Sequence, residues 1–368
     1  MSLPSPSSTA ANPDTSRVHA FILAGGHGAR LQGLTAVRAK PAVAFAGSLR
    51  MIDFTLSNCL NSGLTQVSVL TQYRSESVER HLEGGWWRVA ANGGEVRVLR
   101  AARAGGYRGT ADAVHQHLDR LRRQGVRQLV VLAGDHVCKM DLRALLRTHA
   151  RLGAGLTVAA VDVPLADAHA FGVLRSNAFG RVIDFEEKPA RPLAIPGRDD
   201  RALASMGIYA ASIDVLDRLL ARDADDPASC HDFGHDILPR ALADGLLAVH
   251  HFDAGCVRAA GQAVYWRDVG TVDAYWEANI DLTSFVPALD LYDRNWPIWT
   301  YAEITPPAKF VHDENGRRGM AVSSLVSGGC IISGAEIRRR LRHGEPLPET
   351  MFRPEVAAIL AGAKAPSR

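Results

Sequence analysis

A glycine turn followed by basic side chains lies near the start of the chain. Its sequence, AGGHGARLQGLTAVRAKP from Ala24 to Pro41, comes directly after an apolar run. A glycine turn can bring backbone N–H groups close to phosphate oxygens, and Arg30, Arg38 and Lys40 can neutralise them. Leu31 stands where a dinucleotide fingerprint needs glycine or alanine, and the Gly-Lys-Ser/Thr of a Walker A loop is missing. The pattern predicts a polyphosphate-binding loop, with an ordinary tight turn as the structural alternative.

Two aspartates stand at the ends of apolar segments. Asp135 occurs in VVLAGDHVCKMD, and Asp268 occurs in YWRDVGT beside Trp266. Mg²⁺ in nucleotide sites commonly takes one or two protein carboxylates together with substrate phosphates. A turn or helix cap explains either residue taken alone, whereas the pair predicts a Mg²⁺ site beside the phosphate loop. His136 is interpreted as an orienting group, because phosphate oxygens need no general base.

A second group of potential metal ligands lies in CHDFGHD, from Cys230 to Asp236. No third segment clearly adds a ligand, so we interpret this stretch as a helix start rather than a metal centre. The five cysteines contain no Cys-x-x-Cys pair, which favours free thiols over disulfides or a zinc cluster.

Alternating strands and helices must position these side chains. Continuous apolar strands interleaved with amphipathic helices predict a mainly parallel sheet covered on both faces. Such sheets bind ligands beyond the carboxyl ends of their strands. The expected strands are 18–24, 66–71, 128–133 and 156–163, and the expected helices are 51–61, 75–82, 110–123 and 142–152.

Composition excludes several classes of protein. The 368 residues are 47% hydrophobic, enough for about two domains. No run is long enough to span a membrane and no signal peptide is recognisable, so we expect a cytoplasmic protein without membrane contact. The net charge is +3 and the sequence shows no basic patch before the tail. Both observations argue against binding of nucleic acid. Only five of the 42 basic residues are lysines, so Lys40, Lys139 and Lys188 stand out.

A series of motifs then carries a specific resemblance. AGGxGxRL with RAKP, GTADAV, LAGDH, FEEKP, SMGIY, YWRDVGT and TPPAKF occur in that order between Val18 and Ile337. In this the chain resembles the bacterial glucose-1-phosphate adenylyltransferases, or ADP-glucose pyrophosphorylases. The resemblance implies transfer of the adenylyl group of ATP to glucose 1-phosphate, with Mg²⁺, for glycogen-type glucan synthesis. It also implies an α/β fold, with a Rossmann-like, mainly parallel sheet followed by the start of a left-handed parallel β-helix.

The resemblance assigns roles to residues of the matching motifs. The catalytic residues would be Arg30, Lys40 and Asp135. The nucleotide would contact Gly25, Gly26, Gly28, Gln72, Gly109 and Thr110. The sugar phosphate would contact Tyr107, Gly172, Glu187, Lys188, Ser205, Gly207 and Asp232. The metal ligands would be Asp135 and Asp268.

The end of the chain departs from this family's pattern. The expected domains are a disordered lead (1–16), a nucleotidyltransferase domain (17–285), a linker (286–320), a first β-helix coil (321–337) and an Arg-rich tail (338–368). The tail shows no hexapeptide period, so we expect a truncated β-helix. The resemblance implies a homotetramer, whose contacts this change would weaken.

Two other functions stay open from the sequence. One is a nucleotidyltransferase for another nucleotide or sugar phosphate, since loop shape decides specificity. The other is a non-catalytic subunit or inactive homologue. The aromatic residues Trp296, Trp299 and Tyr301 are interpreted as packing the linker against the main domain.

Overall fold

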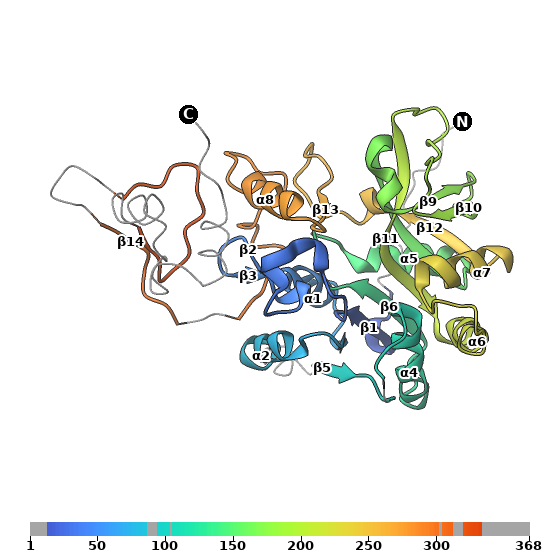
Figure 1. Cartoon of the computed structure of the whole chain (residues 1–368). Coiled ribbons are helices and arrows are strands. Elements are labelled where there is room, and N and C mark those ends of the chain that lie inside the picture. The colour runs from blue at the N-terminus through green and yellow to red at the C-terminus, as the bar shows by residue number, and fades with distance from the viewer. Residues whose placement is uncertain (1–12, 87–93, 104, 302–303, 312–318, 333–368) are drawn as a thin grey trace, which may run out of the picture.

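The structure is a computed structural model that describes residues 13–86, 94–103, 105–301, 304–311 and 319–332. Four parallel strands form one half of its main sheet. They neighbour one another in the order β6-β1-β4-β5 (Figure 1). Their bounds are β1 (Val18–Leu23), β4 (Gln66–Thr71), β5 (Glu95–Arg100) and β6 (Gln128–Ala133). Phe21 packs into the core on one face of β1 and Ile22 into the core on the other. Because both faces are covered, the strand is apolar apart from His19.

An antiparallel half continues the same sheet. Its central strand, β11 (Arg201–Ser212), pairs antiparallel with β6 and with β8 (Leu156–Pro164). The remaining strands are β9 (Gly172–Ser176), β10 (Val182–Glu187) and β12 (Leu247–His251). The prediction of an α/β fold with a mainly parallel central sheet is confirmed, and β11 extends that sheet in the opposite direction.

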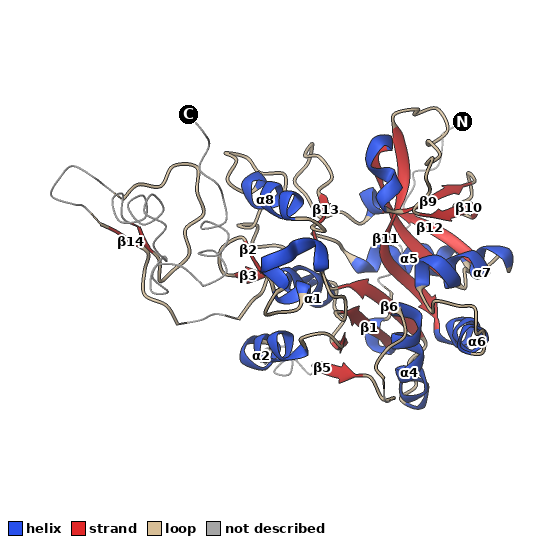
Figure 2. Ribbon diagram, in the orientation of Figure 1, coloured by secondary structure: helices blue, strands red, loops and turns tan. Residues whose placement is uncertain are grey.

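Helices cover both faces of the sheet, as Figure 2 shows. The helices of one face are α1 (Met51–Asn61), α2 (Ser75–Gly85) and α5 (Leu142–Leu152). The helices of the other face are α4 (Thr110–Arg123), α6 (Ile213–Ala224) and α7 (Leu238–Ala243). A third core lies between α1 and α8 (Val272–Asp281), beside the strand pair β2 (Ala44–Phe45) and β3 (Leu49–Arg50).

Short helical turns complete the fold. They are η1 (Thr15–Arg17), η2 (Ala29–Thr35), η3 (Lys40–Ala42), η4 (Leu165–Ala170), η5 (Phe233–Ile237) and η6 (Phe252–Ala254). Within the ranges given above, no helix has both the length and the apolar character needed to cross a bilayer. Only the last residues of the predicted lead (1–16), from Pro13 onward, are among the described residues, and they run into η1.

The segment after α8 packs on the main domain and leads to a second short sheet. Trp296 Nε1 donates to Asn58 Oδ1 on α1 at 3.0 Å, and Trp299 Nε1 donates to Asn61 Oδ1 at 3.2 Å. The interpretation of these aromatic residues as packing groups is thus confirmed. Beyond them, β14 (Lys309–Phe310) pairs in parallel with β15 (Ile331–Ile332), as successive coils of a parallel β-helix do. The predicted tail, 338–368, lies outside the described residues.

Three buried histidines predict a loss of stability in mild acid. Burial lowers the pKa of His19, His149 and His250 from 6.5 to about 4. Between these values the unfolded chain binds protons that the folded chain does not, so the free energy of unfolding falls as the pH drops. Each histidine contributes up to about 3 kcal/mol to this fall, which is large enough to measure against the stability of a typical domain. Thermal unfolding followed by circular dichroism should show the loss between pH 6.5 and pH 4.

Replacing one of these histidines separates its part of the effect. His149 bonds Thr157 Oγ1 at 2.9 Å and Ser212 Oγ at 3.2 Å, contacts that do not require a charged ring. His149→Gln should make the pH dependence shallower by about the contribution of one histidine. His169→Gln, at an exposed position, is the control and should leave the slope unchanged. A slope unaffected by His149→Gln would contradict the explanation.

Candidate functional site

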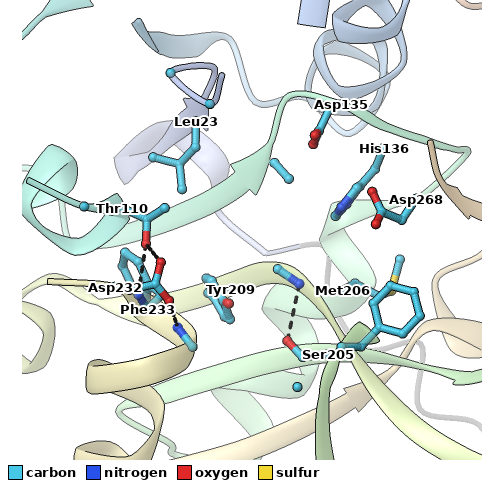
Figure 3. A pocket seen from close by; sticks show the side chains of 18 of the residues that line it. Leu23, Thr110, Asp135, His136, Ser205, Met206, Tyr209, Asp232, Phe233 and Asp268 are labelled. Atoms are coloured by element: carbon cyan, nitrogen blue, oxygen red, sulfur yellow. Dashed lines mark hydrogen bonds between the residues drawn. The ribbon is translucent and has the colours of Figure 1, made fainter. Parts of the chain in front are cut away.

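A cavity of about 510 Å³ opens at the carboxyl ends of β1, β4 and β6. This is the edge at which open α/β sheets bind ligands. Figure 3 shows Asp135, His136 and Asp268 gathered on one side of the cavity and Thr110, Asp232 and Phe233 on the other. The cavity therefore has two polar walls.

The glycine loop after β1 reaches the cavity with its first two residues. Gly25 and Gly26 line the cavity. Gly28 packs behind them with a left-handed φ of 60°. A Cβ on Gly28 would come within 3.0 Å of Lys40 Cβ and 3.1 Å of Thr35 Cγ2. Gly28 is thus required for the close packing of Lys40 rather than for lining the cavity.

Lys40 connects the two aspartates of the first wall. Its Nζ lies 2.7 Å from Asp135 Oδ2 and 3.4 Å from Asp268 Oδ1. Burial alone would lower the pKa of Lys40, but the two carboxylates raise it above its ordinary value. Burial would likewise raise the pKa of Asp135, but the charges of Lys40 and His136 lower it. Lys40 and Asp135 are therefore charged together at neutral pH.

A small antiparallel pair of strands brings the aspartates together. β7 (His136–Cys138) pairs with β13 (Trp266–Asp268), with His136 opposite Asp268. Asp135 directly precedes β7, so the pairing places it beside Asp268 although the two are far apart in sequence. The carboxylate side chains are 26% and 25% exposed, which leaves both partly open to the cavity.

The second wall is a hydrogen-bonded contact between the start of α4 and the start of η5. Thr110 Oγ1 donates to Asp232 Oδ2 at 2.9 Å and accepts from the N–H of Phe233 at 2.9 Å. Asp232 Oδ1 caps η5 by accepting from Gly234 and His235. Both oxygens of Asp232 are therefore held in fixed directions beside the cavity.

Glu187 and Lys188 lie where β10 ends, at the rim of this wall. Lys188 Nζ is 3.1 Å from Glu187 Oε1, and the Lys188 side chain is 66% exposed. Glu187 Oε2 packs closely against Gly172 and Gly234. A Cβ on Gly172 would lie 2.7 Å from this oxygen, and a Cβ on Gly234 would lie 2.5 Å from it. Lys188 also has a φ of 48°, which is unusual for a residue with a side chain. Such strain often accompanies functional positions.

The floor of the cavity contains a bulge and an amide contact. The register of β11 shifts between Ser205 and Ile208, where Gly207 has a φ of 63°. Such bulges re-aim side chains in strands. Gln72, after β4, accepts from the backbone N–H of Tyr107, which fixes its amide beside the glycine loop.

The comparisons with known proteins agree with this architecture. The nucleotidyl transferase family model matches residues 19–284, and the GlmU-like C-terminal hexapeptide model matches residues 306–343. The glucose-1-phosphate adenylyltransferase of Rhodopseudomonas palustris (strain TIE-1) is 56% identical over 88% of this chain and 78% of its own length. Those of Jannaschia sp. (strain CCS1) and Albidiferax ferrireducens are 52% and 53% identical, again over 88% of this chain and over 79% and 78% of their own lengths.

The chain belongs to the glucose-1-phosphate adenylyltransferase family. Of the residues to which the sequence gave a site role, most line this cavity. Those that do so are Gly25, Gly26, Gln72, Tyr107, Gly109, Thr110, Asp135, Gly172, Glu187, Lys188, Ser205, Gly207, Asp232 and Asp268. Gly28, Arg30 and Lys40 are not part of that lining. Arg30 is exposed, and Lys40 contacts the two aspartates that line the cavity.

The adenylyltransferase cavity also includes aromatic residues that the predicted contacts left out. Trp266 makes edge contacts with His136 and with Phe171, both at 5.4 Å between ring centres. Tyr209 stacks on Phe233 at 5.0 Å. The sequence signal was present, because each lies beside a predicted site residue. Neighbours in a strand or turn do not reveal which rings meet across a cavity.

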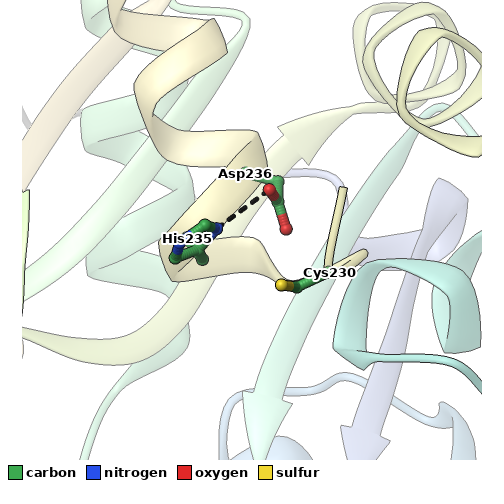
Figure 4. A group of neighbouring side chains, drawn as sticks. All are labelled: Cys230, His235 and Asp236. Carbon is green, nitrogen blue, oxygen red and sulfur yellow. Dashed lines mark hydrogen bonds and ion pairs between the residues drawn. The ribbon is translucent and has the colours of Figure 1, made fainter. Parts of the chain in front are cut away.

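The potential metal ligands of CHDFGHD have a structural explanation in this adenylyltransferase. Cys230, His235 and Asp236 place one ligand atom each within 4.8 Å of one another (Figure 4). However, Asp236 Oδ2 accepts from the N–H of Asp232 at 2.9 Å and Oδ1 bonds His235 Nδ1 at 3.0 Å. His231 bonds Asp223 instead, at 2.8 Å. These contacts form the start of a helix, as interpreted from the sequence.

A methyl group at Gly109 should disrupt the second wall. A Cβ there would lie 2.3 Å from the carbonyl oxygen of His231 and 2.6 Å from that of Cys230. Gly109→Ala must therefore separate α4 from η5 and break the bond between Thr110 and Asp232. We expect the KM for the sugar phosphate to rise about tenfold, the effect of one lost hydrogen bond of about 1.5 kcal/mol, measured by initial rates.

Gly125→Ala is the control for this substitution. Gly125 follows the same helix at its far end, and a Cβ there meets nothing within 4 Å. Its left-handed φ of 77° makes alanine unfavourable for the backbone there, whereas Gly109 has an extended φ of −171°, so the control carries a backbone cost that Gly109→Ala does not. An unchanged KM in Gly109→Ala, or an equal rise in both variants, would contradict the role of this contact.

Proposed function

We propose that the protein transfers the adenylyl group of ATP to α-D-glucose 1-phosphate, releasing pyrophosphate and forming ADP-glucose for glycogen-type glucan synthesis. An oxygen of the sugar phosphate attacks the α-phosphorus of ATP while the bond from that phosphorus to the bridging oxygen of pyrophosphate breaks. The observation that carries the proposal is one cavity with a glycine loop and paired carboxylates on one side and Glu187 with Lys188 on the other. Its similarity to known adenylyltransferases selects the substrates.

The first wall supplies the phosphate-binding functions. The N–H groups of Gly25 and Gly26 bind triphosphate oxygens, while Arg30 and Lys40 oppose the charge of the leaving pyrophosphate. Gln72 contacts the adenine. Because the reaction needs no covalent intermediate, these residues act by holding two anions together against their repulsion.

Asp135 and Asp268 suit a divalent cation, which we propose is Mg²⁺. Both carboxylates are partly exposed to the cavity, and carboxylate oxygen is the ligand that Mg²⁺ prefers. When bound, Mg²⁺ would neutralise phosphate charge and orient the triphosphate for attack.

The second wall binds the sugar phosphate. Lys188 contacts its phosphate, and Glu187 and Asp232 accept hydrogen bonds from glucose hydroxyls. Ser205, Gly207, Tyr107 and Gly172 shape the pocket around the ring. The hydrogen bonds that fix Asp232 before substrate arrives support this assignment, because a preorganised acceptor loses little entropy on binding.

Pyrophosphate release with five nucleotides tests the proposal. Purified protein, Mg²⁺ and glucose 1-phosphate are mixed with ATP, UTP, CTP, GTP or dTTP in separate reactions. Release with ATP is the expected result. Release only with another nucleotide would replace the nucleotide and keep the mechanism, and no release from folded protein would contradict an enzymatic role.

A further inference from the structure

Asn58 on α1 is a buried amide that joins two separate segments. Its side chain is 3% exposed. Nδ2 donates to the carbonyl of Cys138 at 3.0 Å, while Oδ1 accepts from the N–H of Met140 and from Nε1–H of Trp296, both at 3.0 Å. The indole N–H and the N–H of Met140 can only donate, and the carbonyl of Cys138 can only accept, so all three bonds require the same orientation of the amide.

These bonds place a peptide-like group along the open edge of β7. β7 has one strand neighbour among the described residues, β13. A primary amide offers the same donor and acceptor as a backbone peptide, so Asn58 takes the place of a strand on the other edge. The position of β7 is therefore set by β13 on one side and by Asn58 on the other.

The position of β7 in turn sets that of Asp135, which directly precedes it. We propose that Asn58 is a positioning residue, which holds β7 so that Asp135 keeps its place beside Lys40 and Asp268. The inference rests on the proposed function, in which these carboxylates serve the reaction. A displacement of about 1 Å at such a group can lower a rate about 100-fold.

Comparison of Asn58→Ala with Asn61→Ala tests the inference. Asn61 lies on the same helix, but its side chain bonds the carbonyl of Pro297 at 2.9 Å and Nε1 of Trp299 at 3.2 Å, not β7. Asn58→Ala should lower kcat about 100-fold with little change in the KM for ATP. Hydrogen exchange in the full chain should also become faster at the N–H of Met140. Asn61→Ala should leave kcat and this exchange unchanged, even where its Tm falls as far.

Two results would overturn the inference: wild-type kcat in folded Asn58→Ala, or an equal loss of kcat in both variants. Should Asn58→Ala not fold, Asn58→Ser retains a hydroxyl that can accept from Met140 and allows the same comparison. Turnover by the unchanged protein in the same assay tests the proposed function separately. Hydrogen exchange at the N–H of Met140 reports on β7 without any substrate. A failure of the positioning inference can therefore be distinguished from a failure of the proposed function.

Discussion

Asp135→Asn is expected to lower turnover at least about 1,000-fold, the upper range for loss of one preorganised transition-state contact. The amide preserves the shape of the side chain but removes the charge that faces both the cavity and Lys40, at 2.7 Å. It also provides a poorer ligand for a hard divalent cation. Lys40 keeps Asp268 as a partner at 3.4 Å, so the fold should survive. Pyrophosphate release and circular dichroism measure the two effects.

Asp141→Asn is a matched control for this experiment. Asp141 lies six residues further on, and its side chain is 22% exposed and holds Arg143 at 2.8 Å. It therefore resembles Asp135 in exposure and in having a cationic partner, but it caps α5 instead of lining the cavity. Its substitution should leave turnover near normal. Comparable turnover in Asp135→Asn and wild type would remove Asp135 from the reaction.

Lys188→Ala is expected to raise the KM for glucose 1-phosphate about 10- to 100-fold, corresponding to a charged hydrogen bond of about 1.5–3 kcal/mol. The KM for ATP should change much less, because Lys188 lies across the cavity from the glycine loop. Lysine and alanine are both strained at the φ of 48°, so the backbone cost largely cancels. Initial rates with each substrate varied in turn measure the two constants.

Arg191→Ala is the control for Lys188→Ala. Arg191 is an exposed cation three residues away in the same loop. Its removal changes the local charge equally without removing a residue of the cavity wall. Equal effects of Lys188→Ala on both substrates, or an equal effect of Arg191→Ala, would contradict the assignment of Lys188 to the sugar phosphate.

Much of the fold was predictable because its local signals are strong. The bounds of α1, α4, α5, β4 and β6 agree with those expected from apolar spacing and end residues. α2 continues past its predicted end through Gly84 and Gly85. Glycine is needed at both positions because Tyr301 approaches the helix closely there. The antiparallel direction of β11 was not predictable, because direction depends on the distant strands β6 and β8 rather than on local pattern.

The site was predictable as a set of residues but not as an arrangement. The motifs placed the glycine loop, Asp135 and Asp268 at strand ends, which border a single crevice in a sheet of this kind. They did not show that Lys40 would bridge the aspartates, which depends on the pairing of β7 with β13. Lys139 also stood out in the sequence because the chain has few lysines. Its Nζ, however, is 3.4 Å from Asp293, and Lys139 lies outside the cavity lining.

The pairing of β7 with β13 also affects when the protein can become active during its synthesis. His136 and Asp268 emerge from the ribosome far apart in time, and their contact closes a loop that contains β8 to β12. Long-range contacts of this kind form late, because loop entropy must be lost before they are made. The parallel strands β1, β4 and β6 can associate earlier on the nascent chain. We therefore expect the carboxylate pair to assemble after these parallel strands, once β13 has been made.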